Sequence, residues 1–96
     1  MGSELRKSVR VRIRGRVQGV WYRAWTVQEA KKRGVSGWVR NRHDGSVEAL
    51  FMGDGGAVDD LIAACRRGPE LARVETVEQT EDPGEAIDGF EQRPSA

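Results

Sequence analysis

The residues best suited to chemistry lie in one short stretch, residues 15–23, which reads Gly-Arg-Val-Gln-Gly-Val-Trp-Tyr-Arg. Its two glycines, Gly15 and Gly19, allow main-chain N–H groups to point inward together because no Cβ stands in the way. Arg23 adds a guanidinium on the first turn of a predicted helix, whose N-terminus contributes unpaired donors and partial positive charge. Donors of this kind together suit a tetrahedral anion such as phosphate.

Glycine spacing alone leaves a second interpretation open, because an ordinary strand-to-helix connection also uses glycine for its geometry. Residues 15–23 do not form a Walker-type phosphate loop, since Gly-Lys-Ser/Thr is absent, and they do not match the dinucleotide-binding pattern Gly-x-Gly-x-x-Gly. Taken by themselves, these residues therefore predict either an anion-binding loop or a plain turn.

Asn41 is the second residue of interest. Its parity with Val39 places it on the helix-covered face of a predicted strand, near the end, where that face opens to water. An amide there needs a partner. It could shape the turn toward Asp44-Gly45 or, if the neighbouring strand brings it opposite the loop at 15–20, hold a water molecule against a bound phosphate.

The remaining reactive side chains predict structure rather than chemistry. His43 is the only histidine and lies in a predicted exposed turn, without companions that could bind a metal. Cys65 sits on the apolar stripe of a predicted helix and is expected in the core. No Ser–His–Asp grouping or inward carboxylate pair can be assembled. An enzyme with so little general-base equipment needs an intrinsically reactive substrate.

The elements that must position these residues follow the order β-α-β-β-α-β, with a possible extra short strand. The expected elements are a strand at 9–14, a helix at 24–33, a hairpin at 36–52, a helix through Val58 to Cys65, a strand within 71–81 that contains a bulge or a twist, and a short strand at 90–93. Two helices on one face of an antiparallel sheet predict an α+β, ferredoxin-like sandwich. A loose arm is expected at 1–8, one domain at 9–93 and a tail at 94–96.

The register of the hairpin can be argued from side-chain parity. A two-residue Asp-Gly loop would mix core and solvent positions. A three-residue loop with Gly45 left-handed pairs Val39 with Ala49 and Arg40 with Glu48, so apolar faces apolar and opposite charges face each other. We therefore predict the second register.

Composition narrows the class of protein. Ninety-six residues suffice for one domain, and a single cysteine rules out an intrachain disulfide and fits a reducing compartment. We expect a cytoplasmic protein without a membrane segment, because no apolar run approaches the ~18 residues that a span requires. Residues 1–42 hold twelve Lys/Arg against two Asp/Glu, whereas residues 43–96 hold four against thirteen, so the net charge of +1 conceals two oppositely charged halves.

Two stretches resemble the signature motifs of the acylphosphatase family. These are residues 15–23 and residues 37–48, Gly-Trp-Val-Arg-Asn-Arg-His-Asp-Gly-Ser-Val-Glu, and the resemblance extends over about residues 8–93. It implies hydrolysis of the carboxyl–phosphate bond of small acyl phosphates by a monomer that needs neither metal nor cofactor. By this likeness Arg23 binds phosphate, Asn41 orients the attacking water, and main-chain amides complete a cradle formed by Gln18, Gly19, Val20, Trp21, Tyr22 and Arg23.

Departures from the family pattern are small. Trp21 and Tyr22 stand where the family commonly has smaller or phenylalanine-like residues, and His43 stands where proline is frequent. The first departure bears on the preference for the acyl group, and the second bears only on the stiffness of the turn.

Two other functions remain as alternatives. The same topology serves RNA-recognition domains, and an open sheet face would here show Trp38 beside the arginines Arg10, Arg12, Arg14, Arg40 and Arg42. Against nucleic acid, Trp38 is the only aromatic there, and the glutamates of residues 75–81 are expected to neutralise neighbouring arginines. A regulatory anion sensor that binds phosphate without turnover is the third interpretation.

Overall fold

The computed structural model describes residues 5–96. Its elements, in chain order, are β1 (Arg6–Arg16), α1 (Tyr22–Lys32), β2 (Ser36–Asn41), β3 (Val47–Asp54), α2 (Gly55–Cys65), β4 (Arg73–Glu81) and β5 (Phe90–Gln92). Among these described residues no helix is long and apolar enough to cross a membrane.

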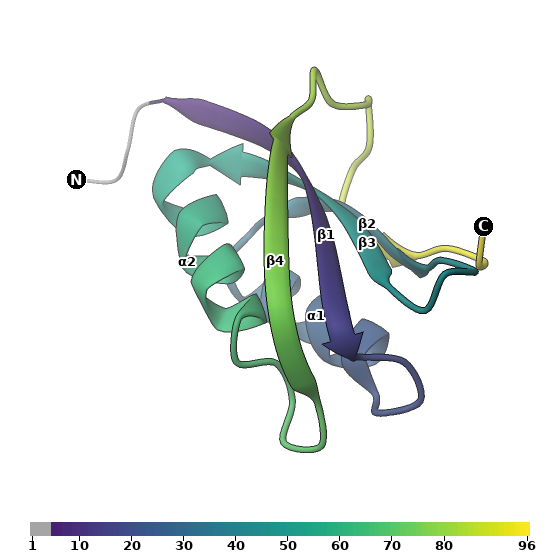
Figure 1. Ribbon diagram of the computed structural model, residues 1–96. Coiled ribbons are helices and arrows are strands. Elements are labelled where there is room, and N and C mark those ends of the chain that lie inside the picture. The colour runs from purple at the N-terminus through teal and green to yellow at the C-terminus, as the bar shows by residue number, and fades with distance from the viewer. Residues whose placement is uncertain (1–4) are drawn as a thin grey trace.

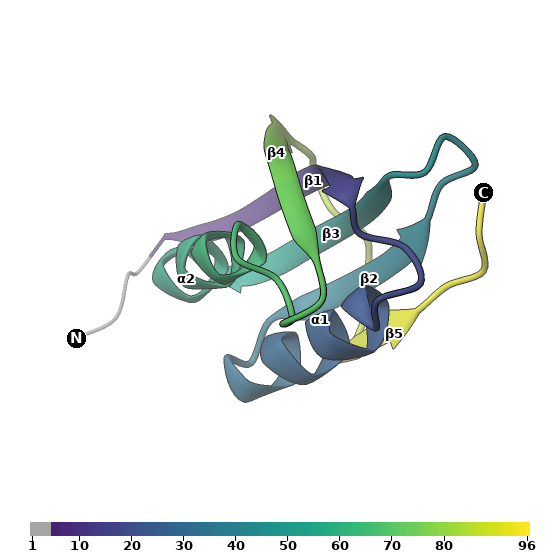
Figure 2. The same ribbon diagram turned by 60° about the horizontal axis from the view of Figure 1, so that its bottom comes forward.

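The five strands form one sheet in the order β4-β1-β3-β2-β5, and both helices cover the same face of it (Figures 1 and 2). This confirms the predicted ferredoxin-like sandwich. The prediction of a purely antiparallel sheet needs a correction, because β5 pairs with β2 in parallel. The sheet is therefore mixed, and the chain reaches β5 through the long connection at 82–89.

Several boundaries differ from the sequence expectation. β1 begins at Arg6, which pairs with Asp54, so the chain is already ordered within the expected arm at 1–8; residues 1–4 of that arm lie outside the described residues. α1 begins at Tyr22, two residues earlier than predicted. In the expected tail at 94–96, Ala96 donates its main-chain N–H to the carbonyl of Asn41.

The predicted hairpin register is confirmed. Val39 pairs with Ala49 and Arg40 with Glu48 across β2 and β3, and Gly45 adopts φ +93°. The expected bulge in β4 is confirmed as well. Arg14 of β1 faces Thr76 while the next residue faces Val74, which leaves one extra residue on β4.

The core lies between the sheet and the two helices. On α1 the buried side chains include Tyr22, Thr26 and Ala30, and on α2 the apolar stripe from Val58 to Cys65 is buried as well. α2 starts at a side-chain cap, because the Asp54 carboxylate accepts the N–H of the third helical residue at 3.2 Å. This packing holds the first turn of α1 beside the ends of β1 and β2.

Candidate active site

A cleft of about 430 Å³ opens where the loop after β1, the start of α1, the end of β2 and β5 meet. It brings together five of the seven residues that the sequence singled out: Gly19, Trp21, Tyr22, Arg23 and Asn41. The other three lining residues are Val17, Ala24 and Gln92. Two of the predicted cradle residues, Gln18 and Val20, do not line it.

The loop that leads into α1 has two residues in the left-handed region of backbone conformation. Gly19 has φ +74° and Trp21 has φ +67°. A Cβ at position 19 would meet no atom within 4 Å, so glycine serves the backbone angle there rather than space. At Gly15 the reason is steric, because a Cβ would overlap the carbonyl oxygen of Arg73 on β4. The loop therefore closes tightly against β4 and then turns sharply into the helix.

The main-chain N–H groups of residues 18–24 donate no hydrogen bond to any residue that the structure describes. The first main-chain bond of α1 is donated by Trp25 to the carbonyl of Trp21, at 3.0 Å. The donors of residues 21–24 are the orphan groups that every helix N-terminus leaves, and these four residues line the cleft. They are available to an anion.

Gln18 connects this loop to the β2–β3 hairpin. Its side-chain amide donates to the carbonyls of Arg42 and Ser46, at 2.8 and 2.9 Å. The side chain is thus used in positioning, which the sequence did not reveal, because the two acceptors are main-chain atoms 24 and 28 residues away. Val20 is 5% exposed and packs in the core. That the amides of Gln18 and Val20 contact phosphate stays a prediction.

Arg23 is half-buried at the cleft, and none of the described residues forms an ion pair or hydrogen bond with its guanidinium. The nearby sheet arginines differ, since Arg10, Arg40 and Arg42 all bind the carboxylate of Glu48. A cation without a counter-ion in a cleft favours an anionic ligand.

Asn41 lies at the end of β2 with its side-chain oxygen, Oδ1, buried and without a hydrogen-bond partner among the described residues. The alternative that Asn41 shapes the following turn is not supported, because Asp44 does so: its carboxylate accepts the N–H and the hydroxyl of Ser46, at 2.9 and 2.6 Å. These bonds lower the pKa of Asp44 to about 2. Asn41 lines the cleft, so a water molecule or ligand bound there would supply the partner that this oxygen lacks.

The cleft holds little acid–base equipment. Its lining residues include no carboxylate, histidine or cysteine. Burial raises the pKa of the Tyr22 hydroxyl, which donates to the carbonyl of Cys65 at 2.6 Å, and burial likewise raises the pKa of the Cys65 thiol to about 12. His43 is exposed in the turn, as predicted. Within residues 5–96 no three metal-ligating side chains gather in one place.

Three lining residues were not anticipated from the sequence. Val17 and Ala24 flank the predicted cradle of residues 18–23, so a cradle one residue longer at each end would have included them. Gln92 comes from β5 and reaches the site only because β5 pairs in parallel with β2. No local pattern in the sequence predicts that pairing.

The opposite face of the sheet differs from the expected open, basic surface. Trp38 is 1% exposed, and its ring lies between the guanidinium groups of Arg40, Arg93 and Arg10, at 4.6, 5.1 and 5.4 Å from its centre. Its indole N–H donates to Glu85 in the 82–89 connection. No stacking surface for bases is therefore present at Trp38, and the RNA-binding alternative loses its main support.

The arginines of this face are neutralised, although not chiefly by the glutamates of residues 75–81 as expected. Of that group, Glu78 pairs with Arg14 at 3.5 Å. The central partner is Glu48, which is 3% exposed and forms ion pairs with four arginines, Arg10, Arg12, Arg40 and Arg42. It comes from β3, between the two basic strands.

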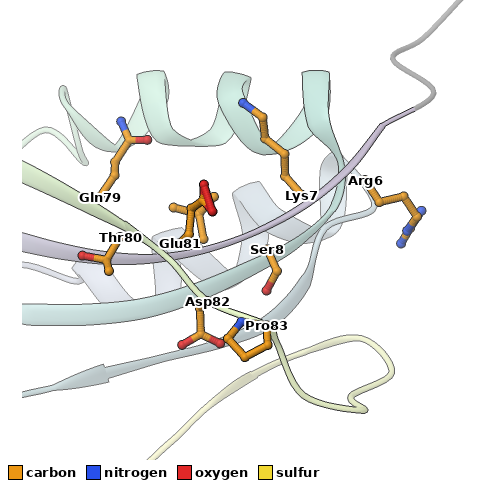
Figure 3. A pocket seen from close by; sticks show the side chains of 9 residues that line it. Arg6, Lys7, Ser8, Gln79, Thr80, Glu81, Asp82 and Pro83 are labelled. Atoms are coloured by element: carbon orange, nitrogen blue, oxygen red, sulfur yellow. The ribbon is translucent and has the colours of Figure 1, made fainter.

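Two larger hollows, of about 620 and 680 Å³, lie at the other end of the sheet around residues 6–8. Figure 3 shows that the side chains of the first hollow diverge: Lys7 and Gln79 point to one side of the strands, and Ser8 and Asp82 point to the other. Lys7 is also paired with Asp59 of α2, at 2.8 Å. These side chains do not converge on one ligand, so the cleft at Arg23 is the better candidate.

The sequence profile of the acylphosphatase family matches residues 9–92. The chain belongs to the acylphosphatase family. The acylphosphatases of Rhodospirillum rubrum and Thiobacillus denitrificans are 54% and 52% identical to it, over 93% and 91% of this chain and 98% and 97% of their own lengths. The crystal structure of the acylphosphatase from Bacillus subtilis is similar with a TM-score of 0.87 and 34% identity, covering 93% of this chain and 99% of that one.

The acylphosphatase fold is also found inside a much larger protein. Full-length HypF matches with a TM-score of 0.88 at 22% identity, over 95% of this chain but only 12% of the HypF chain. At that identity the likeness concerns the fold alone. The family that the sequence motifs indicated is confirmed by the closer relatives.

Proposed function

We propose that this acylphosphatase hydrolyses the carboxyl–phosphate bond of small acyl phosphates and releases a carboxylate and inorganic phosphate. One observation supports this most directly. Among the described residues, the cleft combines a cation without a counter-ion, at Arg23, with a buried amide oxygen without a partner, at Asn41. The first matches a charged phosphoryl group, and the second matches a water molecule beside it.

The phosphoryl group would be bound by the Arg23 guanidinium and by main-chain N–H groups of residues 18–23. A planar guanidinium can donate two parallel hydrogen bonds to phosphate oxygens. The side chain of Gln18 attaches this loop to the β2–β3 hairpin in the structure without substrate. Donors that are already oriented stabilise the charge of the transition state without having to reorganise.

The attacking water would donate a hydrogen bond to Oδ1 of Asn41. The oxygen of this water molecule forms the new bond to phosphorus. The bond between phosphorus and the carboxyl oxygen breaks, and the carboxylate leaves with the electron pair. The protons of the water remain with the phosphate or pass to solvent. Because a carboxylate is a good leaving group, positioning and charge stabilisation suffice and no strong base is needed.

We further propose that the enzyme acts as a cytoplasmic monomer without a metal or cofactor. Both side chains assigned to the reaction, those of Arg23 and Asn41, come from one chain and line one cleft. The single cysteine, Cys65, is buried in the core and takes no part in the cleft. Sedimentation equilibrium tests the monomer, since a self-associated species at assay concentration would contradict it.

The decisive assay measures release of inorganic phosphate from benzoyl phosphate, with and without a chelator. We expect steady release that the chelator does not slow. Phosphate binding without release would instead favour the anion sensor, and salt-sensitive retention of RNA without release would favour the nucleic-acid alternative. Loss of activity with the chelator, restored by a divalent metal, would contradict the metal-independent mechanism.

A further inference from the structure

Trp21 is unusual in two independent respects. Its φ of +67° is the only positive value at a non-glycine position among residues 5–96. It is also 77% exposed, although indole is among the largest apolar side chains. A bulky aromatic residue in the left-handed region is a genuine outlier, and strain of this kind tends to gather at ligand sites.

The hydrophobic core does not account for this residue. Its neighbour Tyr22 is 1% exposed and bonded to Cys65, and Trp25 packs against the core with its ring 5.4 Å from that of Tyr22. Trp21 belongs to no part of that cluster. If only the turn mattered, glycine or asparagine would adopt the same backbone angle at lower cost.

The position of Trp21 suggests what its exposed surface serves. It lines the cleft together with Arg23 and Asn41, and the cleft of about 430 Å³ lies within the range of about 300–1,000 Å³ typical of pockets for whole small molecules. A bound phosphoryl group alone needs less space. The remaining volume is bordered by apolar Val17 and Ala24 as well as by Trp21, so it suits the acyl part of a substrate.

We propose that Trp21 is a specificity-determining residue whose indole contacts a bulky apolar acyl group, above all an aromatic one, while the phosphoryl group lies against Arg23. This inference rests on the proposed function, because it assumes that the ligand is an acyl phosphate. Two aromatic rings in contact attract each other beyond the effect of burial alone. An acetyl group is too small to make this contact, so the enzyme prefers aromatic acyl phosphates.

The test compares benzoyl phosphate with acetyl phosphate in the wild type and in the variants Trp21→Asn and Trp21→Phe. Asparagine tolerates the left-handed backbone and keeps the main-chain N–H, but removes the indole. We expect the benzoyl-to-acetyl ratio of kcat/KM to fall about two- to tenfold in Trp21→Asn. Trp21→Phe retains most of the ratio. The inhibition constant of inorganic phosphate, which has no acyl group, stays unchanged in both.

A matched control is Leu5→Asn, which removes another exposed apolar side chain, 76% exposed, at the other end of the sheet. This variant keeps the wild-type ratio. An unchanged ratio in Trp21→Asn overturns the inference, as does an equal loss of phosphate binding, which would mean a damaged loop. Wild-type enzyme that hydrolyses neither compound would instead refute the proposed function itself.

Discussion

At the scale of single residues, the arginines on the open face of the sheet differ from Arg23. Those on the open face of the sheet are held by carboxylates, above all by Glu48, so their charge is already compensated. Arg23 has no such partner among the described residues and lies at the N-terminus of α1. Its charge is therefore available to a ligand. Arg23 is one of twelve Lys/Arg within residues 1–42, so the number of basic residues alone does not point to it.

The substitution Arg23→Lys tests whether the fork of the guanidinium matters or only its charge. We expect kcat/KM for benzoyl phosphate to fall at least about 10²–10³-fold, together with a marked loss of phosphate affinity, because lysine cannot donate two parallel bonds. Because Arg23 has no hydrogen-bond or ion-pair partner within residues 5–96, thermal stability should hardly change. Arg6→Lys, at the exposed far end of β1, serves as the control and should behave as wild type.

The substitution Asn41→Ala separates turnover from binding. We expect kcat to fall about 10²-fold or more, while the inhibition constant of phosphate changes far less, because Oδ1 is assigned to water rather than to the phosphoryl group. Folding should be retained, since the side-chain oxygen has no hydrogen bond to any described residue that the substitution would remove. Near-native kcat in this variant would mean that Asn41 does not orient the water.

At the scale of elements, the side chains of Gln18 and Tyr22 join residues 15–23 to distant parts of the chain. Gln18 binds two carbonyls of the β2–β3 hairpin, and Tyr22 binds the carbonyl of Cys65 at the end of α2. A Cβ at Gly68 would also stand 2.7 Å from the Tyr22 ring, so the turn after α2 packs closely on it. The first turn of α1 is thus held from both sides.

Removing one of these links gives a stability prediction. Tyr22→Phe deletes the hydroxyl and leaves a buried carbonyl unsatisfied, which should lower the free energy of unfolding by about 1–3 kcal/mol. For a domain of this size each kcal/mol corresponds to a Tm lower by about 4–8 °C. Urea and thermal unfolding measure both quantities. A variant as stable as wild type would show that the 2.6 Å hydrogen bond contributes nothing net.

Strand pairing and burial show which features of the fold local sequence patterns predict. The register of the hairpin followed from Arg40 and Glu48, because one wrong step would have exchanged core and solvent faces. The parallel pairing of β5 with β2 was missed, because a strand of three residues is too short for its sequence to indicate which strand it pairs with or in which direction. The burial of Trp38 was missed for a related reason. Besides Arg40 of the same strand, the residues that enclose it are Arg10, Arg93 and Glu85, which come from three other segments of the chain.

At the scale of the whole molecule, the two oppositely charged halves of the sequence are interleaved. β3, from the acidic half, lies between the basic strands β1 and β2, and this places Glu48 among four arginines. Burial alone would raise the pKa of Glu48, but hydrogen bonds from Arg40 and Arg10, with their charges, outweigh burial and lower it. This carboxylate is therefore charged in the folded state.

This arrangement predicts how the free energy of unfolding changes at low pH. A carboxyl whose pKa is lower in the folded state contributes stability above its unfolded pKa and loses it as pH falls through the folded value. The pKa of Asp44 is lowered as well, from 3.8 to about 2, by its hydrogen bonds from Ser46. We expect stability to fall as pH drops from about 4 to 2, measured as urea midpoints.

Glu48→Gln should lower the free energy of unfolding at pH 7 by about 1–3 kcal/mol. It should also make the loss of stability between about pH 4 and 2 smaller than in the wild type. The control is Asp59→Asn, which breaks the exposed pair with Lys7 and should cost less than about 1 kcal/mol. Equal effects of the two substitutions would show that burial of Glu48 adds nothing.

By itself the sequence determined the order and kind of the elements, the hairpin register and the family, together with Arg23 and Asn41 as the residues to test. These depend on periodicity, turn chemistry and motif spacing, all of which are local along the chain. Only the tertiary structure decided that Gln18 fastens the loop to the hairpin, that Gln92 joins the cleft and that Trp38 is enclosed. Such contacts join residues far apart in sequence, and their partners become known only when the strands are ordered in space.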